Sequence, residues 1–215
     1  MEPDSVEIRV VGCLIEKQRT TPDAYPLSLN SLRLACNQAT NRDPVVEYDE
    51  AMVSEALRRT ALRGWTRLTS GAGSRARKYR HLLPEALDVD DAELALLTVL
   101  MLRGPQTPGE LKQRAERMHG FESLGAVQET LDRLVERELV SRHERRPGQK
   151  ELRYEQLLGG EGESAEVVAP LADAGEVDPP RELPAGAGED RLQRLEREMT
   201  ELRAELAELR EALGD

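Results

Sequence analysis

Aromatic residues are scarce in this chain of 215 residues, where Phe, Trp and Tyr together make up 3% of the sequence. A hydrophobic core must therefore consist mainly of Leu, Val and Ala, which favours packed helices over a large β-sandwich. Long apolar runs are also missing: the run Ala95–Leu102 is far shorter than the roughly 20 residues that cross a bilayer. The acidic opening MEPDSVE lacks the apolar segment of a secretory leader. We therefore expect a cytoplasmic protein without a membrane segment.

Cysteine and histidine are too few and too scattered to indicate a metal site or a catalytic site. Cys13 and Cys36 both lie in apolar, helix-like contexts, and we expect them to be buried free thiols. His81, His119 and His143 have neither metal-ligand spacing nor the partners of a nucleophilic triad. The sequence thus predicts a protein that is not an enzyme and that holds no cofactor or metal.

The net charge of −11 is unevenly distributed. Residues 1–84 carry 13 Lys and Arg against 10 Asp and Glu, a net charge of +3. Residues 85–158 carry 11 against 15, and residues 159–215 carry 6 against 16. Because most of the acidity lies in the tail, the overall charge does not argue against a polyanionic partner for the first part of the chain.

The first 84 residues show three helical patterns followed by a hairpin pattern. The first helix is expected over Val6–Gln18, with Ile8, Val10, Val11, Leu14 and Ile15 facing the core. Ser28 and Asp49 are expected to cap the next two helices, and Val53, Leu57 and Ala61 of the third are expected to face inward. A strand over Trp65–Thr69, a glycine-containing turn and a returning strand RKYRHLL complete the pattern, which is typical of a winged-helix domain.

A second copy of this pattern follows. Asp88 is expected to open its first helix, and Thr107 and Ser123 to cap the next two. VSEALRR of the first copy matches VQETLDR at an offset of 74 residues, and the hairpin dipeptide Lys78-Tyr79 matches Arg153-Tyr154 at an offset of 75. We therefore predict a mainly α fold with small β hairpins, built as two tandem winged-helix domains over residues 5–84 and 85–158.

The tail has a different composition. Residues 159–190 are rich in Gly, Pro and acidic residues, which predicts a flexible linker. Residues 191–214 repeat apolar side chains every three and four positions, and opposite charges at the flanking positions favour a parallel coiled-coil dimer over a single solvated helix, with the strand number left open. The expected dimer seam is Leu192, Leu195, Met199, Leu202, Leu206, Leu209 and Leu213.

The stretch SGAGSRARKYRH, residues 70–81, could be a dinucleotide-binding turn, a nucleic-acid-binding wing or a solvated hairpin tip. A dinucleotide turn must lead into a helix, whereas only seven residues separate Ala76 from Pro84 here. Strand alternation places Arg77, Tyr79 and His81 on one face and Lys78 and Arg80 on the other. The wing and the solvated hairpin both remain possible, and only the wing would place cations against phosphates.

Polar residues before and within the third helix are further candidates for nucleic-acid contacts. The segment ACNQATNR either satisfies helix ends structurally or offers a polar surface beside the hairpin. Carboxylates on the third helix of each copy oppose DNA binding, more so in the second copy, where Gln128, Glu129 and Asp132 favour a protein contact. The candidate nucleic-acid-binding residues are Asn37, Gln38, Asn41, Arg42, Ser54, Arg58, Arg75, Arg77, Lys78 and Arg80.

Three long motifs resemble the YceH-like family of uncharacterised bacterial proteins. They are RVVGCLIEKQRTTPDAYPLSLNSLRLACNQATNRDPV, SGAGSRARKY and RGPQTPGELKQRAERM, and the likeness covers about residues 5–158. The resemblance implies a tandem winged-helix fold and leaves the biochemical role unassigned. We expect a homodimeric protein that binds double-stranded DNA, with a protein-binding scaffold as the alternative.

Overall fold

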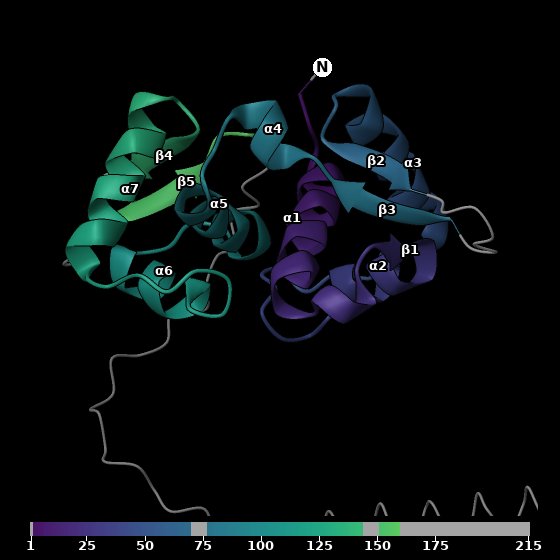
Figure 1. The fold of residues 1–215 in the computed structure, drawn as a ribbon, viewed down its shortest axis with the longest axis horizontal. Coiled ribbons are helices and arrows are strands. Elements are labelled where there is room, and N and C mark those ends of the chain that lie inside the picture. Colours follow the sequence, from purple (N-terminus) through teal and green to yellow (C-terminus); the bar gives the residue numbers. More distant parts are fainter. Residues whose placement is uncertain (1, 70–76, 144–150, 160–215) are drawn as a thin grey trace, which may run out of the picture. The chain divides into compact units, whose positions relative to one another are not determined.

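The computed structural model describes residues 2–69, 77–143 and 151–159. Residues 160–190 of the predicted linker, all seven residues of the predicted coiled-coil seam and Arg75 lie outside these residues. The described part contains seven α-helices and small antiparallel sheets, an architecture compatible with winged-helix domains (Figure 1). In chain order the elements are α1 Ser5–Thr20, the 3-10 turn η1 Pro22–Ala24, β1 Leu27–Ser28, α2 Leu29–Cys36, α3 Glu50–Leu62, β2 Thr66–Thr69, β3 Lys78–His81, α4 Leu83–Leu87, α5 Asp91–Arg103, α6 Pro108–Ala115, α7 Leu124–Glu136, β4 Val140–His143 and β5 Arg153–Gln156.

Two antiparallel strand pairs confirm the predicted hairpin strands. We call β2 with β3 the first hairpin and β4 with β5 the second hairpin, and residues 5–84 and 85–158 the two halves. In the first half β1 adds a third strand by pairing Leu27 with Tyr79. In the second half a single bridge pairs Gln106 with Tyr154 at the matching place. Strand β1 has no signal in the sequence, because two residues are too few to show an alternating pattern.

Helix capping follows the sequence closely, with one exception. Ser28, Asp49, Thr107 and Ser123 cap α2, α3, α6 and α7 through hydrogen bonds to backbone amides, as predicted. Asp88 does not open α5. It lies at the end of α4 in a left-handed conformation, and Asp90 is the N-cap instead. Asp90 forms a capping box with the residue three positions further on, which satisfies two helix-terminal amides.

Helices α1 and α5 pack against each other and join the two halves (Figure 1). Both are buried on nearly all sides, over Glu7–Ile15 and Glu93–Leu102. A Cβ built on Gly12 would lie 3.0 Å from Leu102 Cδ2 and 3.3 Å from Met101 Cβ, so the glycine permits the close approach of the helices. Because α1 meets its own half on one side and α5 on the other, its buried surface is wider than the single face predicted from periodicity.

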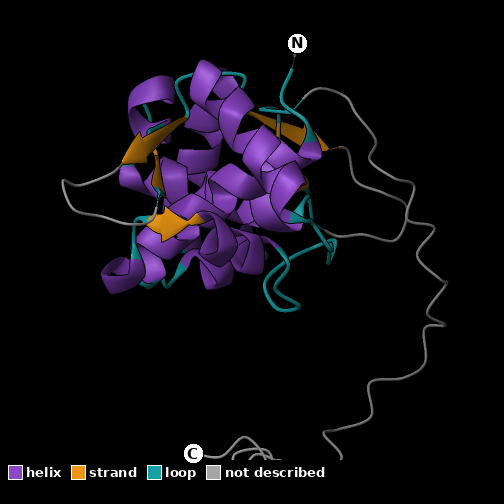
Figure 2. Ribbon diagram, turned by 90° about the vertical axis from the view of Figure 1, so that its right-hand side faces the viewer, coloured by secondary structure: helices purple, strands orange, loops and turns teal. Residues whose placement is uncertain are grey.

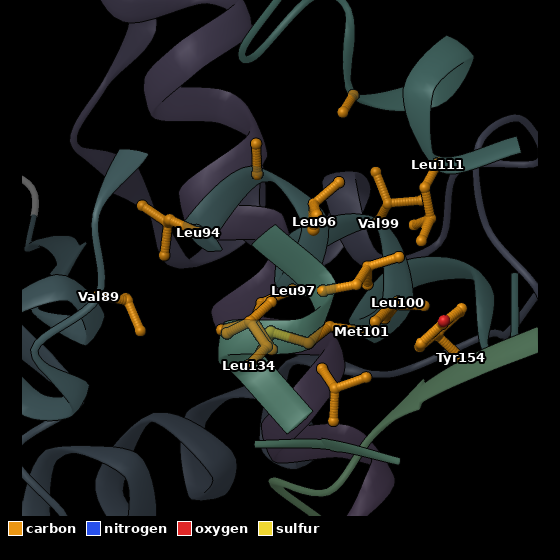
Figure 3. Packing of buried hydrophobic residues seen from close by; sticks show 14 of the residues in the cluster. Val89, Leu94, Leu96, Leu97, Val99, Leu100, Met101, Leu111, Leu134 and Tyr154 are labelled. Atoms are coloured by element: carbon orange, nitrogen blue, oxygen red, sulfur yellow. The ribbon is translucent and has the colours of Figure 1, made fainter. Parts of the chain in front are cut away.

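The core is aliphatic, as the shortage of aromatic residues predicts. Side chains of α5 meet Leu111 of α6, Leu134 of α7 and Tyr154 of β5 in one cluster (Figure 3). The helices form the interior and the short strands lie at the periphery (Figure 2). Val53 and Leu57 of α3 are buried as predicted, but Ala61 is exposed and Thr60 takes the inward position. Cys13 and Cys36 are buried free thiols, which confirms the prediction.

An acidic capping box in the first half binds Arg59 of α3 and Arg63, the C-cap of this helix. Asp4 and Glu7 form the box at the start of α1. Arg59 Nη2 lies 2.5 Å from Asp4 Oδ2, and Arg63 Nε lies 3.2 Å from Glu7 Oε1. The Glu7 side chain is only 1% exposed, so the arginines compensate a charge that water does not reach.

The second half repeats this cluster. Asp90 and Glu93 form the capping box of α5. Arg133 of α7 and Arg137, the C-cap of α7, bind the carboxylates. Arg133 Nε and Arg137 Nη1 each lie 3.2 Å from a different oxygen of Glu93, and Arg133 Nη2 lies 3.3 Å from Asp90 Oδ2. The same contacts in both halves support an internal repeat that extends beyond the motifs visible in the sequence.

Candidate nucleic-acid interface

The exposed face of the first hairpin carries three cations. Arg67 of β2 lies directly opposite Arg80 of β3, and Lys78 lies two residues before Arg80 on the same face. All three residues are exposed, whereas Tyr79 is half-buried and His81 is buried, which confirms the predicted alternation. Arg77 precedes β3 and is also exposed. Arg67 was absent from the sequence-based candidates, although the hairpin register could have revealed it.

This cationic face has no acidic counterpart. Among the described residues, no carboxylate lies within ion-pair distance of Arg67, Arg77, Lys78 or Arg80. Like charges directly opposite each other in a sheet destabilise the sheet by roughly 0.2–1 kcal/mol. An anion placed between the two guanidinium groups would reverse that repulsion, because Arg matches the geometry of a phosphate group.

The second hairpin places different residues at the same register positions. Ser141 pairs with Glu155 where the first hairpin has Arg67 and Arg80. His143 Nε2 lies 2.6 Å from Glu155 Oε2, and Arg153 Nη1 lies 3.2 Å from Glu110 Oε2. Two basic side chains of the second hairpin, His143 and Arg153, therefore have carboxylate partners within the protein.

The candidates between α2 and α3 are largely engaged inside the protein. Arg42 is buried and binds both carboxylate oxygens of Glu16, at 2.6 and 3.1 Å. Although burial opposes ionisation, hydrogen bonds from Arg42 hold the pKa of Glu16 below its ordinary value. Gln38 Oε1 accepts hydrogen bonds from Arg42 and Lys17. Arg42 thus has no exposed guanidinium to offer a ligand.

The two asparagines of this segment also make internal contacts. The side chain of Asn37, the C-cap of α2, donates to the carbonyl of Tyr48 and accepts from the Tyr48 amide, at 2.8 and 2.9 Å. Asn41 has a left-handed backbone, with φ of 61°, and its side-chain oxygen accepts from Arg103. Asn37 and Gln38 are partly exposed and Asn41 is exposed. These contacts favour the structural interpretation of the motif.

The candidates on α3 lie on the surface. Ser54 and Arg58 are exposed, and Arg58 binds Glu55 at 2.6 and 2.9 Å. The hydrogen bond from Arg58 holds the pKa of Glu55 below its ordinary value. Because such a surface pair contributes little, Arg58 can exchange Glu55 for another anion at small cost.

His81 anchors the first hairpin to the rest of the first half. Its backbone amide donates to the Tyr25 hydroxyl at 2.8 Å, and its Nε2 contacts Gln18 Oε1. The ring is buried, and Nδ1 has no hydrogen-bond partner in the described part of the chain. Burial lowers the pKa of His81 to about 4, with smaller contributions of the same sign from Arg19 and Arg80.

Metal and membrane sites are not found where the structure can be described. No group of three His, Cys, Asp or Glu side chains within residues 2–69, 77–143 and 151–159 could hold a metal ion. Within the same ranges, no helix combines the length and hydropathy of a membrane span.

These observations define a small α/β protein with a repeated helix-and-hairpin pattern and one cationic hairpin. The chain belongs to the family described as "Protein of unknown function, DUF480", whose model matches residues 4–149. A UPF0502 protein of Pelobacter propionicus is 47% identical over 216 residues, covering 99% of this chain and 95% of the relative. UPF0502 proteins of Geotalea daltonii and Pectobacterium atrosepticum are 51% and 42% identical, covering 80% and 96% of this chain and 79% and 97% of the relatives. This membership confirms the resemblance seen in the sequence motifs.

Proposed function

We propose that this protein is a non-enzymatic, cytoplasmic DNA-binding protein with two tandem winged-helix domains, and that the first hairpin contacts the phosphate backbone. The opposed pair Arg67 and Arg80 carries the proposal, because it gathers positive charge where the fold gains nothing from it. Lys78 and Arg77 extend the charged surface along the same hairpin. Arg75 would extend it further, but lies outside the described residues.

The repeated contacts support the tandem part of the proposal. Each half has three helices, a hairpin, a bridge from the hairpin tyrosine and a capping box bound by two arginines.

The coiled-coil tail would join two chains, and two basic hairpins on one dimer would raise the apparent affinity. Light scattering of the full chain and of residues 1–190 tests the dimer: equal monomeric masses contradict it.

The surface of α3 argues for weak sequence discrimination. A helix in the major groove reads base edges with its outward residues. Here Ser54 and Arg58 share that surface with Glu50 and Glu55, whose carboxylates repel phosphates. We therefore expect most of the binding free energy to come from backbone contacts that do not depend on sequence.

The test is duplex binding by the full chain at low salt, with a matched charge control. Arg67→Glu with Arg80→Glu should lower the affinity for a random duplex at least about 100-fold, since two phosphate contacts become repulsive. Arg117→Glu with Arg142→Glu changes the net charge equally at exposed sites outside the proposed interface, and should have a much smaller effect. Equal losses in both variants, or no duplex binding by the unmodified chain, would contradict the proposal.

A second candidate function is a protein-binding scaffold. Glu129, Asp132 and Glu136 share one exposed face of α7, and none has an ion-pair partner among the described residues. This surface suits a basic protein partner better than DNA. Capture of a defined partner that is lost in Glu129→Lys with Asp132→Lys, and kept in Arg67→Glu with Arg80→Glu, would favour the scaffold.

A further inference from the structure

The two hairpin tyrosines occupy equivalent positions but have different surroundings. Tyr79 pairs with Leu27, and Tyr154 pairs with Gln106, in each case with the residue just before the cap of the half's second helix. Tyr154 is 1% exposed, whereas Tyr79 is half-buried against the core of the first half. The fold therefore holds both rings in the same way and leaves one of them accessible.

In the second half an internal chain of hydrogen bonds occupies the tyrosine hydroxyl. Gln128 Nε2 lies 2.8 Å from the Tyr154 hydroxyl oxygen and 2.9 Å from Asp132 Oδ1. Gln128 and Asp132 are neighbours on α7, one helical turn apart. The chain Tyr154–Gln128–Asp132 thus ties the second hairpin to the third helix of its half and ends in a carboxylate.

The first half replaces both partners of this chain. The offset of 74 residues between α3 and α7 puts Ser54 in the place of Gln128 and Arg58 in the place of Asp132. A serine side chain is too short to span the distance that Gln128 covers. Within residues 2–69, 77–143 and 151–159, the Tyr79 hydroxyl has no hydrogen-bond partner. Where the second half has the carboxylate of Asp132, the first half has the guanidinium group of Arg58.

We propose that Tyr79, Ser54 and Arg58 form a subsite for one phosphodiester group of the DNA backbone, at the junction of α3 and the first hairpin. The proposal rests on the proposed DNA-binding function and adds Tyr79 as a binding residue. The two hydroxyl groups would donate hydrogen bonds to phosphate oxygens, and Arg58 would exchange its surface contact with Glu55 for the phosphate. The second half cannot bind in this way, because Gln128 fills the site and Asp132 repels the anion.

Single substitutions test the hydroxyl directly, with the second half as the control. Tyr79→Phe should weaken binding of a random duplex by about 5- to 10-fold at fixed salt, because one hydrogen bond to a charged group is lost. The melting temperature of Tyr79→Phe should not change, since the hydroxyl has no partner among the described residues. Tyr154→Phe should lower the melting temperature and leave duplex affinity unchanged.

A double-mutant cycle tests whether Ser54 and Tyr79 act together. Ser54→Gln introduces the residue of the second half, which should occupy the Tyr79 hydroxyl and weaken binding about as much as Tyr79→Phe or more. In the Ser54→Gln background, Tyr79→Phe should have no further effect on affinity.

The outcomes separate this inference from the proposed function. If Tyr79→Phe binds duplex like the unmodified chain while Arg67→Glu with Arg80→Glu does not bind, the subsite is wrong and the proposed function stands. A fall in melting temperature for Tyr79→Phe as large as that for Tyr154→Phe also overturns the subsite, because the hydroxyl then has an internal partner. Absence of duplex binding by the unmodified chain overturns both.

Discussion

The first and second hairpins share a register but present opposite chemistry to solvent. Where the first has Arg67 opposite Arg80, the second has Ser141 opposite Glu155. The backbone pairing, in contrast, is alike: each hairpin tyrosine is bridged to the segment before the second helix. The two hairpins therefore share their backbone pairing and differ in their side chains, which is why we propose that only the cationic face of the first hairpin meets the ligand.

The shared scaffold predicts equal losses of stability in the two halves. Glu7→Ala and Glu93→Ala should each lower the free energy of unfolding by about 3 kcal/mol, because each removes the buried acceptor of two arginines and one capping interaction. Urea denaturation measures this loss. Glu55→Ala, which breaks an exposed pair on α3, should leave the free energy of unfolding nearly unchanged. A large loss in only one half would show that the clusters are not equivalent.

Buried His81 should make the stability of the protein depend on pH. The folded state lowers the pKa of His81 to about 4, so the unfolded state binds more protons between that pH and its own pKa near 6.5. The free energy of unfolding therefore has its full value above pH 6.5. It decreases as the pH falls, by roughly 2–3 kcal/mol near pH 4.

Urea denaturation at pH 7.0 and at pH 5.0 measures this fall in the free energy of unfolding. His81→Gln should flatten the fall in stability at low pH, because the replacement does not titrate. An unaltered pH profile in His81→Gln would contradict the interpretation of the buried ring.

Transfer of the cationic pair should give the second hairpin an affinity for DNA. Ser141→Arg with Glu155→Arg reproduces the Arg67 and Arg80 pair at the matching register. This double variant should raise the affinity for duplex roughly 3- to 10-fold at low salt. Fluorescence anisotropy of a labelled random duplex measures the change. Gln113→Arg on α6 with Glu129→Arg on α7, at two exposed sites, adds the same charge of +3 and controls for net charge. An equal gain there would mean that position on the hairpin is unimportant.

The sequence predicted most of the secondary structure because capping residues and helical periodicity are local signals. Ser28, Asp49, Thr107 and Ser123 each mark a helix start that the structure confirms. The capping boxes at Asp4 and Asp90 were also present in the sequence, but their arginine partners lie more than 40 residues away. Only the three-dimensional contact between the helices shows that they belong together.

The candidate site was predictable only in part, for a related reason. The alternation around Tyr79 identified Lys78 and Arg80 correctly as outward-facing, whereas Arg67 required the register of β2 against β3. Arg42 looked like an available cation because its sequence neighbours are polar. The structure buries it against Glu16, a contact between segments 26 residues apart that no local pattern reveals.

The contact between the first hairpin and the phosphate backbone is tested most directly by the salt dependence of duplex binding. The measurement compares the full chain with the variant Arg67→Ser with Arg80→Glu, which carries the residues of the second hairpin. Each phosphate contact contributes about −0.9 to the slope of log affinity against log salt concentration. We expect a steep slope for the unmodified chain and a slope shallower by about 2 for the variant, since two contacts are removed. An unchanged slope in the variant would show that the outward face of the first hairpin does not meet the phosphate backbone.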